Sequence, residues 1–261
     1  MTSSSTNAAK ALPHFVSTDT YVQDTVWWLE RAVIGLNLCP FAKSVHVKGQ
    51  IHYVVSLATT GEDVLEVLRE ELQALAKTPA EVRDTTLLVM PHCLQDFLDF
   101  NDFLGDVEDV VHVLGLAGTL QVASFHPQFQ FAGTDADDVT NCTNRAPYPT
   151  LHLLREASID RAVSVFPEAE TIFERNMEVL EEMGMAGWLA LDVGPHDKGG
   201  ANMAATAASD RPTAAPKTRF CIPTSPARSG RGPPRRCSSC SAGRSGPRVA
   251  HHRSLHVAPQ S

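Results

Sequence analysis

The sequence contains no long hydrophobic run. No stretch approaches the roughly 20 apolar residues that a helix needs to cross a bilayer, so we expect no membrane segment. Residues 1–16 lack the apolar core of a secretory signal, and although they are rich in Ser and Thr like an organelle transit peptide, they contain no arginine. Six cysteines without a secretory signal are typical of a reducing compartment. We therefore expect a cytoplasmic protein and leave organelle import open.

The sequence also lacks the motifs of several large enzyme classes. It has no glycine-rich phosphate loop with its lysine, no dinucleotide-binding fingerprint and no G-x-S-x-G turn. These absences argue against nucleotide-dependent enzymes and against α/β-hydrolases. The cofactor stays unknown at this stage, and no feature indicates an oligomeric state.

Charge is divided very unevenly along the chain. Residues 1–198 hold 12 Lys and Arg against 29 Asp and Glu, a net charge of −17, whereas residues 199–261 hold 10 basic residues against one acidic residue, a net charge of +9. A strongly acidic segment repels nucleic acid. We therefore do not expect the acidic part to bind DNA or RNA.

The basic part has the composition of a disordered tail. Ala, Gly, Ser, Pro and Arg dominate it, and such a sequence buries too little apolar surface to fold. Cys237, Cys240, His251 and His252 resemble a zinc site only loosely, because a second ligand pair at fixed spacing is missing. An out-of-frame or mispredicted exon would explain the abrupt change as well. We delimit three parts: a disordered segment over 1–17, a single domain over 18–193, and a disordered Arg/Pro/Ser-rich tail over 194–261.

Helical and strand patterns alternate in the acidic part, which predicts an α/β fold. The predicted strands are 51–57, 85–90 and 119–125, and the predicted helices are 19–36, 62–77, 94–114, 150–165 and 168–183. We expect a small three-stranded sheet, mostly parallel or ferredoxin-like, packed with helices. If the strands are parallel, His92 and His126 emerge at the same edge, where open sheets collect ligands.

The richest stretch of polar residues runs from Gln121 to Glu156. Its predicted strand ends at His126, which the following Pro127 and aromatic residues hold in a defined direction, as acid/base chemistry requires. A structural role, in which His126 caps the strand through a backbone hydrogen bond, would explain the same residues. In the predicted helix, His152 and Glu156 are four residues apart and would share one face.

Several residues of this stretch have side chains suited to binding an anion. Arg145 and Arg155 carry the planar guanidinium that matches carboxylate and phosphate groups. The candidate substrate-binding residues are Asn141, Asn144, Arg145 and Arg155. An internal network of hydrogen bonds and ion pairs is the alternative for all of them.

Several motifs resemble the bacterial and eukaryotic family called domain of unknown function 1415. They are CPFA at 39–42, TTLLV at 85–89, DFLDFNDFL at 96–104, LQVASFHPQFQFAGT at 120–134 and TNRAPYPTLHLLREASIDRAV at 143–163. The resemblance spans residues 19–188 and implies a single domain, without implying an activity. It also favours a functional role for Cys39, although a thiol at a helix C-terminus is disfavoured as a thiolate.

Three functions stay open. The first is a small soluble enzyme acting on a small anionic metabolite, with His126 as acid/base, Arg145 and Arg155 on the anion, Cys39 as nucleophile and His152 as a further catalytic residue. The second is a divalent-metal-binding protein or metal-dependent hydrolase that uses Cys39, His126, His152 and Glu156. The third is a non-catalytic binding or scaffold domain. We favour the first.

Overall fold

The computed structural model describes residues 17–164 and 171–196. Apart from Ser17 and residues 194–196, the two segments predicted to be disordered lie outside the described residues, and so do Cys237, Cys240, His251 and His252. None of the described helices is long and apolar enough to cross a membrane.

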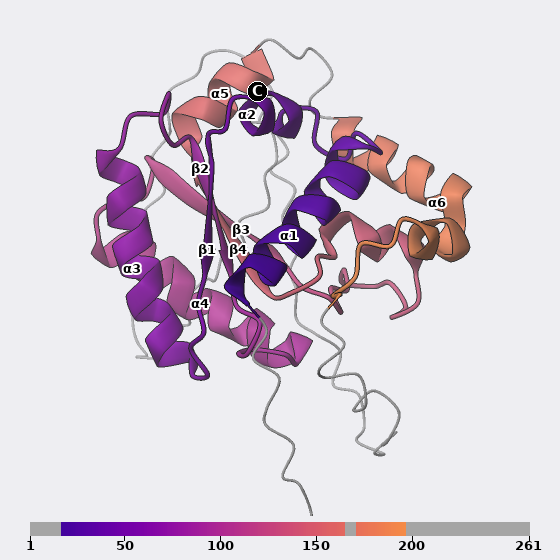
Figure 1. Ribbon diagram of the computed structural model, residues 1–261, viewed down its shortest axis with the longest axis horizontal. Helices are drawn as coiled ribbons and strands as arrows, with labels where there is room; N and C mark the ends of the chain where they lie inside the picture. Colours follow the sequence, from indigo (N-terminus) through magenta and orange to yellow (C-terminus); the bar gives the residue numbers. More distant parts are fainter. Residues whose placement is uncertain (1–16, 165–170, 197–261) are drawn as a thin grey trace, which may run out of the picture.

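The fold is a mixed α/β structure built on one open sheet of four strands (Figure 1). The strands are β1 (Ile51–Val55), β2 (Thr85–Val89), β3 (Leu120–Phe125) and β4 (Thr150–Arg155), in the order β1-β2-β4-β3. β1 and β2 are parallel, whereas β4 lies antiparallel between β2 and β3. The α/β class is confirmed. The count of three strands is wrong, because the fourth strand lies where a helix was predicted.

β4 is a strand because its apolar residues alternate. Leu151 and Leu153 point to one face of the sheet and belong to a buried cluster there, while His152 between them points to the other face. The i, i+4 spacing of His152 and Glu156 suggested a helix, but α5 (Glu156–Ser164) begins only at Glu156. The two residues therefore do not share a helical face.

The helices cover both faces of the sheet. They are α1 (Thr18–Trp28), the π-helical segment η1 (Leu29–Ile34), α2 (Ala42–Val47), α3 (Gly61–Lys77), α4 (Phe97–Val113), the 3-10 helix η2 (Val139–Asn144), α5 and α6 (Ile172–Ala190). α3 and α4 pack on one face, and α1, η1 and α6 lie on the other (Figure 1). α6 bends at Gly184, which has φ 65°, so the predicted helix end at this glycine is a kink.

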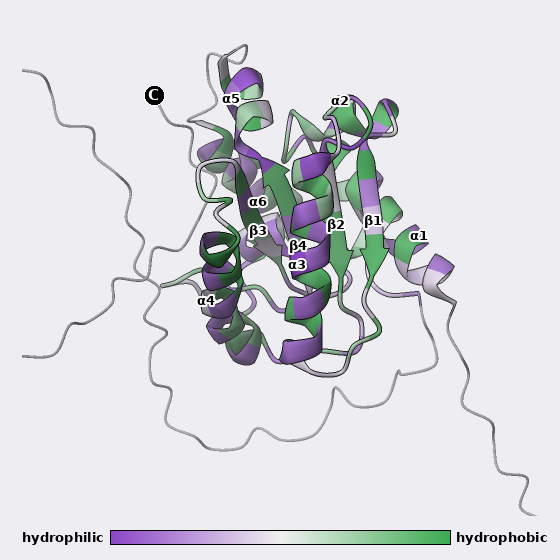
Figure 2. Ribbon diagram, turned by 90° about the vertical axis from the view of Figure 1, so that its left-hand side faces the viewer, coloured by the Kyte–Doolittle hydropathy of each residue, from purple (hydrophilic) through white to green (hydrophobic). Residues whose placement is uncertain are grey.

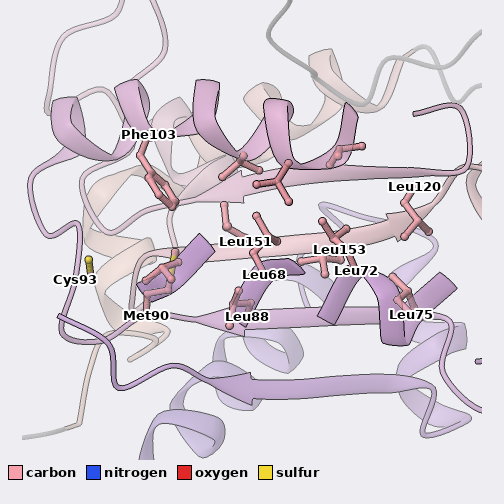
Figure 3. Packing of buried hydrophobic residues seen from close by; sticks show 14 of the residues in the cluster. Leu68, Leu72, Leu75, Leu88, Met90, Cys93, Phe103, Leu120, Leu151 and Leu153 are labelled. Atoms are coloured by element: carbon pink, nitrogen blue, oxygen red, sulfur yellow. The ribbon is translucent and has the colours of Figure 1, made fainter. Parts of the chain in front are cut away.

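The larger apolar cluster lies between the sheet and α3 and α4. Leu68, Leu72 and Leu75 form the buried stripe of α3, and this stripe faces Leu88 of β2 and Leu151 and Leu153 of β4 (Figure 3). The outward face of α3 is mainly hydrophilic (Figure 2), whereas α4 also exposes Leu98 and Val113. This division into an apolar inner and a polar outer face is what fixes α3 and α4 against the sheet.

The second cluster lies on the opposite face. Its buried residues are Trp28, Leu29, Ala32, Val33, Leu38, Cys142, Ala146, Leu180, Trp188 and Val193. Cys39, Tyr53 and Phe125 pack against it while only partly buried. This face of the sheet is therefore less completely covered than the face under α3 and α4.

Arg155 connects β4 to the end of α3. Its guanidinium donates to the backbone carbonyls of Leu75, Thr78 and Arg83. We expect Arg155→Met to lower the free energy of unfolding by about 2–3 kcal/mol, because these carbonyls lose a charged donor. Denaturant unfolding measures the loss, and the exposed Arg161→Met is the control, with a change of roughly 0.5 kcal/mol or less. Equal effects of the two variants would contradict the assigned role.

Candidate functional site

His126 uses both of its ring nitrogens for backbone contacts. Nδ1 accepts from the Gln128 N–H at 3.0 Å, and Nε2 lies 3.1 Å from the Leu94 carbonyl, to which it donates. The ring is fully buried against Phe97 and Phe100 of α4, and this burial lowers its pKa. His126 thus ties the loop after β3 to the loop after β2, where Leu94 has φ 57°.

The two loops meet because β2 and β3 run in the same direction. Val89 at the end of β2 and Phe125 at the end of β3 are both paired with Thr150 of β4. His92 and His126 therefore follow strand ends at one edge of the sheet, as predicted.

The polar loop between β3 and β4 is held together by its own side chains. The fully buried Asn141 accepts from the Phe131 N–H and the Thr134 hydroxyl and donates to the Asp135 carbonyl. Asn144 donates to the Ser124 carbonyl. These contacts hold the loop in a fixed shape.

Both arginines of the predicted anion site also bind backbone carbonyls. Arg145 donates to the carbonyls of Phe129 and Ala136, and Arg155 donates to those at the end of α3. The structure therefore does not bring Arg145 and Arg155 together, because one organises the loop and the other lies at the far end of β4.

Cys39 and His152 are on the same face of the sheet. His152 packs beside Phe125, with ring centroids 6.2 Å apart, and both Cys39 and Phe125 pack against the second cluster. His126 contacts α4 on the opposite face. Two of the three predicted catalytic residues thus lie on one face of the sheet, and the third lies on the opposite face.

Tyr53 lies on the same face and in the same row as His152. The register pairs Tyr53 of β1 with Leu87 of β2, and Leu87 with His152 of β4. The Tyr53 hydroxyl is buried and has no hydrogen-bond partner within the described residues. Burial and the Glu30 carboxylate raise the pKa of Tyr53 to about 12.

Among the described residues, the His152 ring contacts Phe125 and makes no hydrogen bond, and its nitrogens are less enclosed than the Tyr53 hydroxyl. Its side chain is half-buried among apolar neighbours, and burial lowers its pKa to about 4. The ring is therefore neutral at neutral pH, with one nitrogen able to donate and the other able to accept.

The Cys39 thiol lies just before α2, which begins at Ala42. Burial raises its pKa, while the backbone N–H groups of Phe41 and Ala42 act in the opposite direction with smaller effect. The sequence placed this cysteine at a helix C-terminus, yet the structure shows that it also precedes a second helix. Because burial dominates, the resting sulfur is a thiol.

A second cluster of polar side chains joins α1 to the residues that follow α6. We call it the Asp24 group, and it comprises Asp24, Tyr148 and His196. The Asp24 carboxylate is 1% exposed; it accepts from the Tyr148 hydroxyl at 2.6 Å and contacts the His196 ring at 2.8 Å. Tyr21 lies beside Tyr148, and its hydroxyl is 3.3 Å from His92. Within the described ranges, no three His, Cys, Asp or Glu side chains are grouped so that they could hold a metal ion.

Residues 20–190 match the model of a family described as "Protein of unknown function (DUF1415)". The chain belongs to this family. No curated protein and no solved structure matches it. The match agrees with the resemblance seen over residues 19–188.

Sequence reasoning missed several polar residues of this DUF1415 domain. Tyr53 stands in a strand pattern, IHYVV, which signals its face but not its lack of a partner. Asp24 could have been noticed as an acidic residue beside the apolar stripe of the first helix. Its partner His196 is 172 positions away, and no local pattern connects the two.

The low pKa of His152 predicts a loss of stability in acid. Protonation of His152 is less favourable in the folded than in the unfolded state. The free energy of unfolding therefore falls as the pH drops from about 6.5 towards 4, by roughly 3 kcal/mol over the whole range. In His152→Leu, denaturant unfolding at pH 7, 6 and 5 should show a smaller fall in the free energy of unfolding, because the contribution of His152 is absent. His112→Gln, at an exposed histidine, should show the same fall as the wild type. An unchanged pH dependence in His152→Leu would contradict the assigned burial.

Proposed function

We propose that the DUF1415 domain is an enzyme that acts on a small molecule with an anionic oxygen, bound on the sheet face that carries Tyr53 and His152. The observation that supports this proposal is that the two side chains share one row of the sheet, where the buried Tyr53 hydroxyl has no partner among the described residues and the less enclosed His152 ring makes no hydrogen bond to any of them. Buried polar groups in folded proteins are nearly always paired, since an unpaired one costs about 1–3 kcal/mol. A ligand oxygen that accepts from the Tyr53 hydroxyl would recover this cost, and the His152 ring offers it a second polar contact.

The spacing of the two residues suits a small ligand. They are two strands apart, which separates their Cα atoms by roughly 10 Å, and both side chains rise from the same face. The buried Leu87 lies between them and forms an apolar floor. His152 is only half-buried, so its ring stays accessible.

The two groups offer complementary chemistry. The high pKa of Tyr53 keeps its hydroxyl protonated, so it is a permanent donor to an oxygen atom. The pKa of His152 is too low for an efficient base at neutral pH. A bound anion would raise that pKa by favouring the imidazolium, and His152 would then hold or release a proton at the bound oxygen.

The local backbone also supports a site on this face. η1 is a π-helical segment, a form often found at functional sites, and it leads through Asn37, which has φ 56°, into Cys39. Trp28, Leu29 and Ala32 of this stretch pack in the second cluster with Cys39 and Tyr53. The irregular segment therefore covers the face on which the unpaired groups lie.

This proposal differs from the sequence prediction in its anion-binding residues. Asn141, Asn144, Arg145 and Arg155 are engaged with the backbone, so we assign the oxygen-binding role to Tyr53 and His152 instead. His126 holds two loops together in this proposal. Because the described cysteines Cys39, Cys93 and Cys142 are free, we also propose a reducing compartment such as the cytoplasm.

The two tyrosines Tyr53 and Tyr148 give a matched test. Tyr53→Phe removes an unpaired hydroxyl, so the free energy of unfolding should stay within about 0.5 kcal/mol or rise, whereas Tyr148→Phe breaks a bond to Asp24 and should cost about 1–3 kcal/mol. Small carboxylates and phosphates are then screened against wild type by thermal shift and by the His152 ring signal in NMR.

We expect a compound that binds to wild type and to Tyr148→Phe and raises the pH midpoint of the His152 ring signal in both. The same compound should not bind to Tyr53→Phe or to His152→Leu. A hit that survives in both site variants would contradict the proposed site. If no compound binds, a scaffold role is favoured. If only divalent cations such as Zn²⁺ bind, with His152 required, the metal function replaces this one.

Cys39 is the candidate nucleophile in this proposal. Because its resting pKa is raised, we expect iodoacetamide to label Cys39 more slowly than a free thiol at pH 7. Mass spectrometry of the labelled peptide gives the rate, with Cys39→Ser as the control. Labelling faster than that of a free thiol would show that the sulfur is already activated without substrate.

A further inference from the structure

We infer that the C-terminal end of the domain is a clasp on helix α1 that is closed by protonated His196 and loosens as the pH rises. The clasp comprises residues 191–196, which follow α6. This inference is independent of the proposed activity, because it rests on the Asp24 group rather than on Tyr53 and His152.

Several contacts of the clasp do not involve the His196 ring. Arg31 of η1 donates to the carbonyls of Leu191 and Asp192 at 3.2 and 3.0 Å, and Val193 is buried in the second cluster. The His196 backbone N–H donates to Asp24 Oδ2 at 2.9 Å. These contacts place the His196 ring over α1, where it meets the edge of Trp27 at a centroid distance of 4.6 Å.

The His196 ring lies between two carboxylates. Nδ1 is 2.8 Å from Asp24 Oδ1, and Nε2 is 3.2 Å from Asp192 Oδ2. Carboxylates only accept hydrogen bonds, and a neutral imidazole has a single N–H. Both contacts are therefore made together only by the imidazolium.

The charged surroundings favour this protonated form. The groups that face the ring within the described residues are Asp24 from α1 and Asp192 from the clasp, with Arg31 from η1 at 3.7 Å from Asp192. Tyr148, which precedes β4, donates its hydroxyl to Asp24. Hydrogen bonds to Asp192 and then to Asp24 raise the pKa of His196 above its ordinary value.

The direction of the pH effect follows from that raised pKa. The stabilisation by His196 is complete below its ordinary pKa of about 6.5 and is lost as the pH rises through the higher folded value. The buried His126 and His152 act in the opposite sense, because their pKa values are lowered. A measurement on the whole domain would mix the two effects, so the test has to read the clasp itself.

Hydrogen exchange of the His196 backbone N–H reports directly on whether the clasp is closed, since this N–H donates to Asp24. Hydrogen exchange of the full chain, followed by NMR from pH 6 to 8.5, should show its protection factor falling about two- to fivefold, the range expected for an ion pair partly open to solvent. The His196 ring should titrate above 6.5. In His196→Gln, whose side-chain amide keeps one donor without titrating, the protection factor should not depend on pH.

Two further variants make the outcome decisive. Asp192→Asn removes the carboxylate at Nε2 and should lower the His196 midpoint while the fold persists, because Arg31 still binds the backbone carbonyls. His112→Gln, an exposed histidine on α4, should change nothing. The inference is overturned if the wild-type protection factor does not vary with pH, or if the midpoint of His196 is the same in Asp192→Asn.

Discussion

The position of β4 between β2 and β3 is the constraint on which the rest of the structure depends. Its alternation places Leu151 and Leu153 in the core under α3 and α4, and His152 on the opposite face. Its antiparallel direction lets β2 and β3 end at one edge, where His126 can join their loops. At the other end of the strand, Arg155 fixes α3. One strand of six residues thus decides which face each of these side chains reaches.

The domain contains two kinds of histidine. His126 and His152 are surrounded mainly by apolar groups, which favour the neutral ring, whereas His196 stands between carboxylates, which favour the charged ring. The difference comes from position. His126 follows β3 and His152 lies within β4, and both rings pack against phenylalanine side chains, while His196 follows α6 and meets the buried Asp24 carboxylate of α1.

Much of the fold was predictable because local patterns decide it. The apolar run TTLLV and the stripe of α3 were placed almost to the residue, since each pattern reflects burial along a single element. β4 was missed because His152, Arg155 and Glu156 fit a helical spacing, and only its two neighbouring strands make the extended form better. For the candidate site, local patterns single out Cys39 and His152, which lie on one face of the sheet, but the missing partner of Tyr53 and the burial of Asp24 depend on contacts between distant segments.

The contact between Asp24 and His196 has a consequence for how the protein is made. The carboxylate is almost fully enclosed, and the ring and N–H that cap it are 172 positions further along the chain. During synthesis, the first helix leaves the ribosome long before its partner does, so it cannot reach its final burial until the last part of the domain has emerged. Folding of this domain is therefore completed after translation of the whole unit, rather than progressively from the N-terminus.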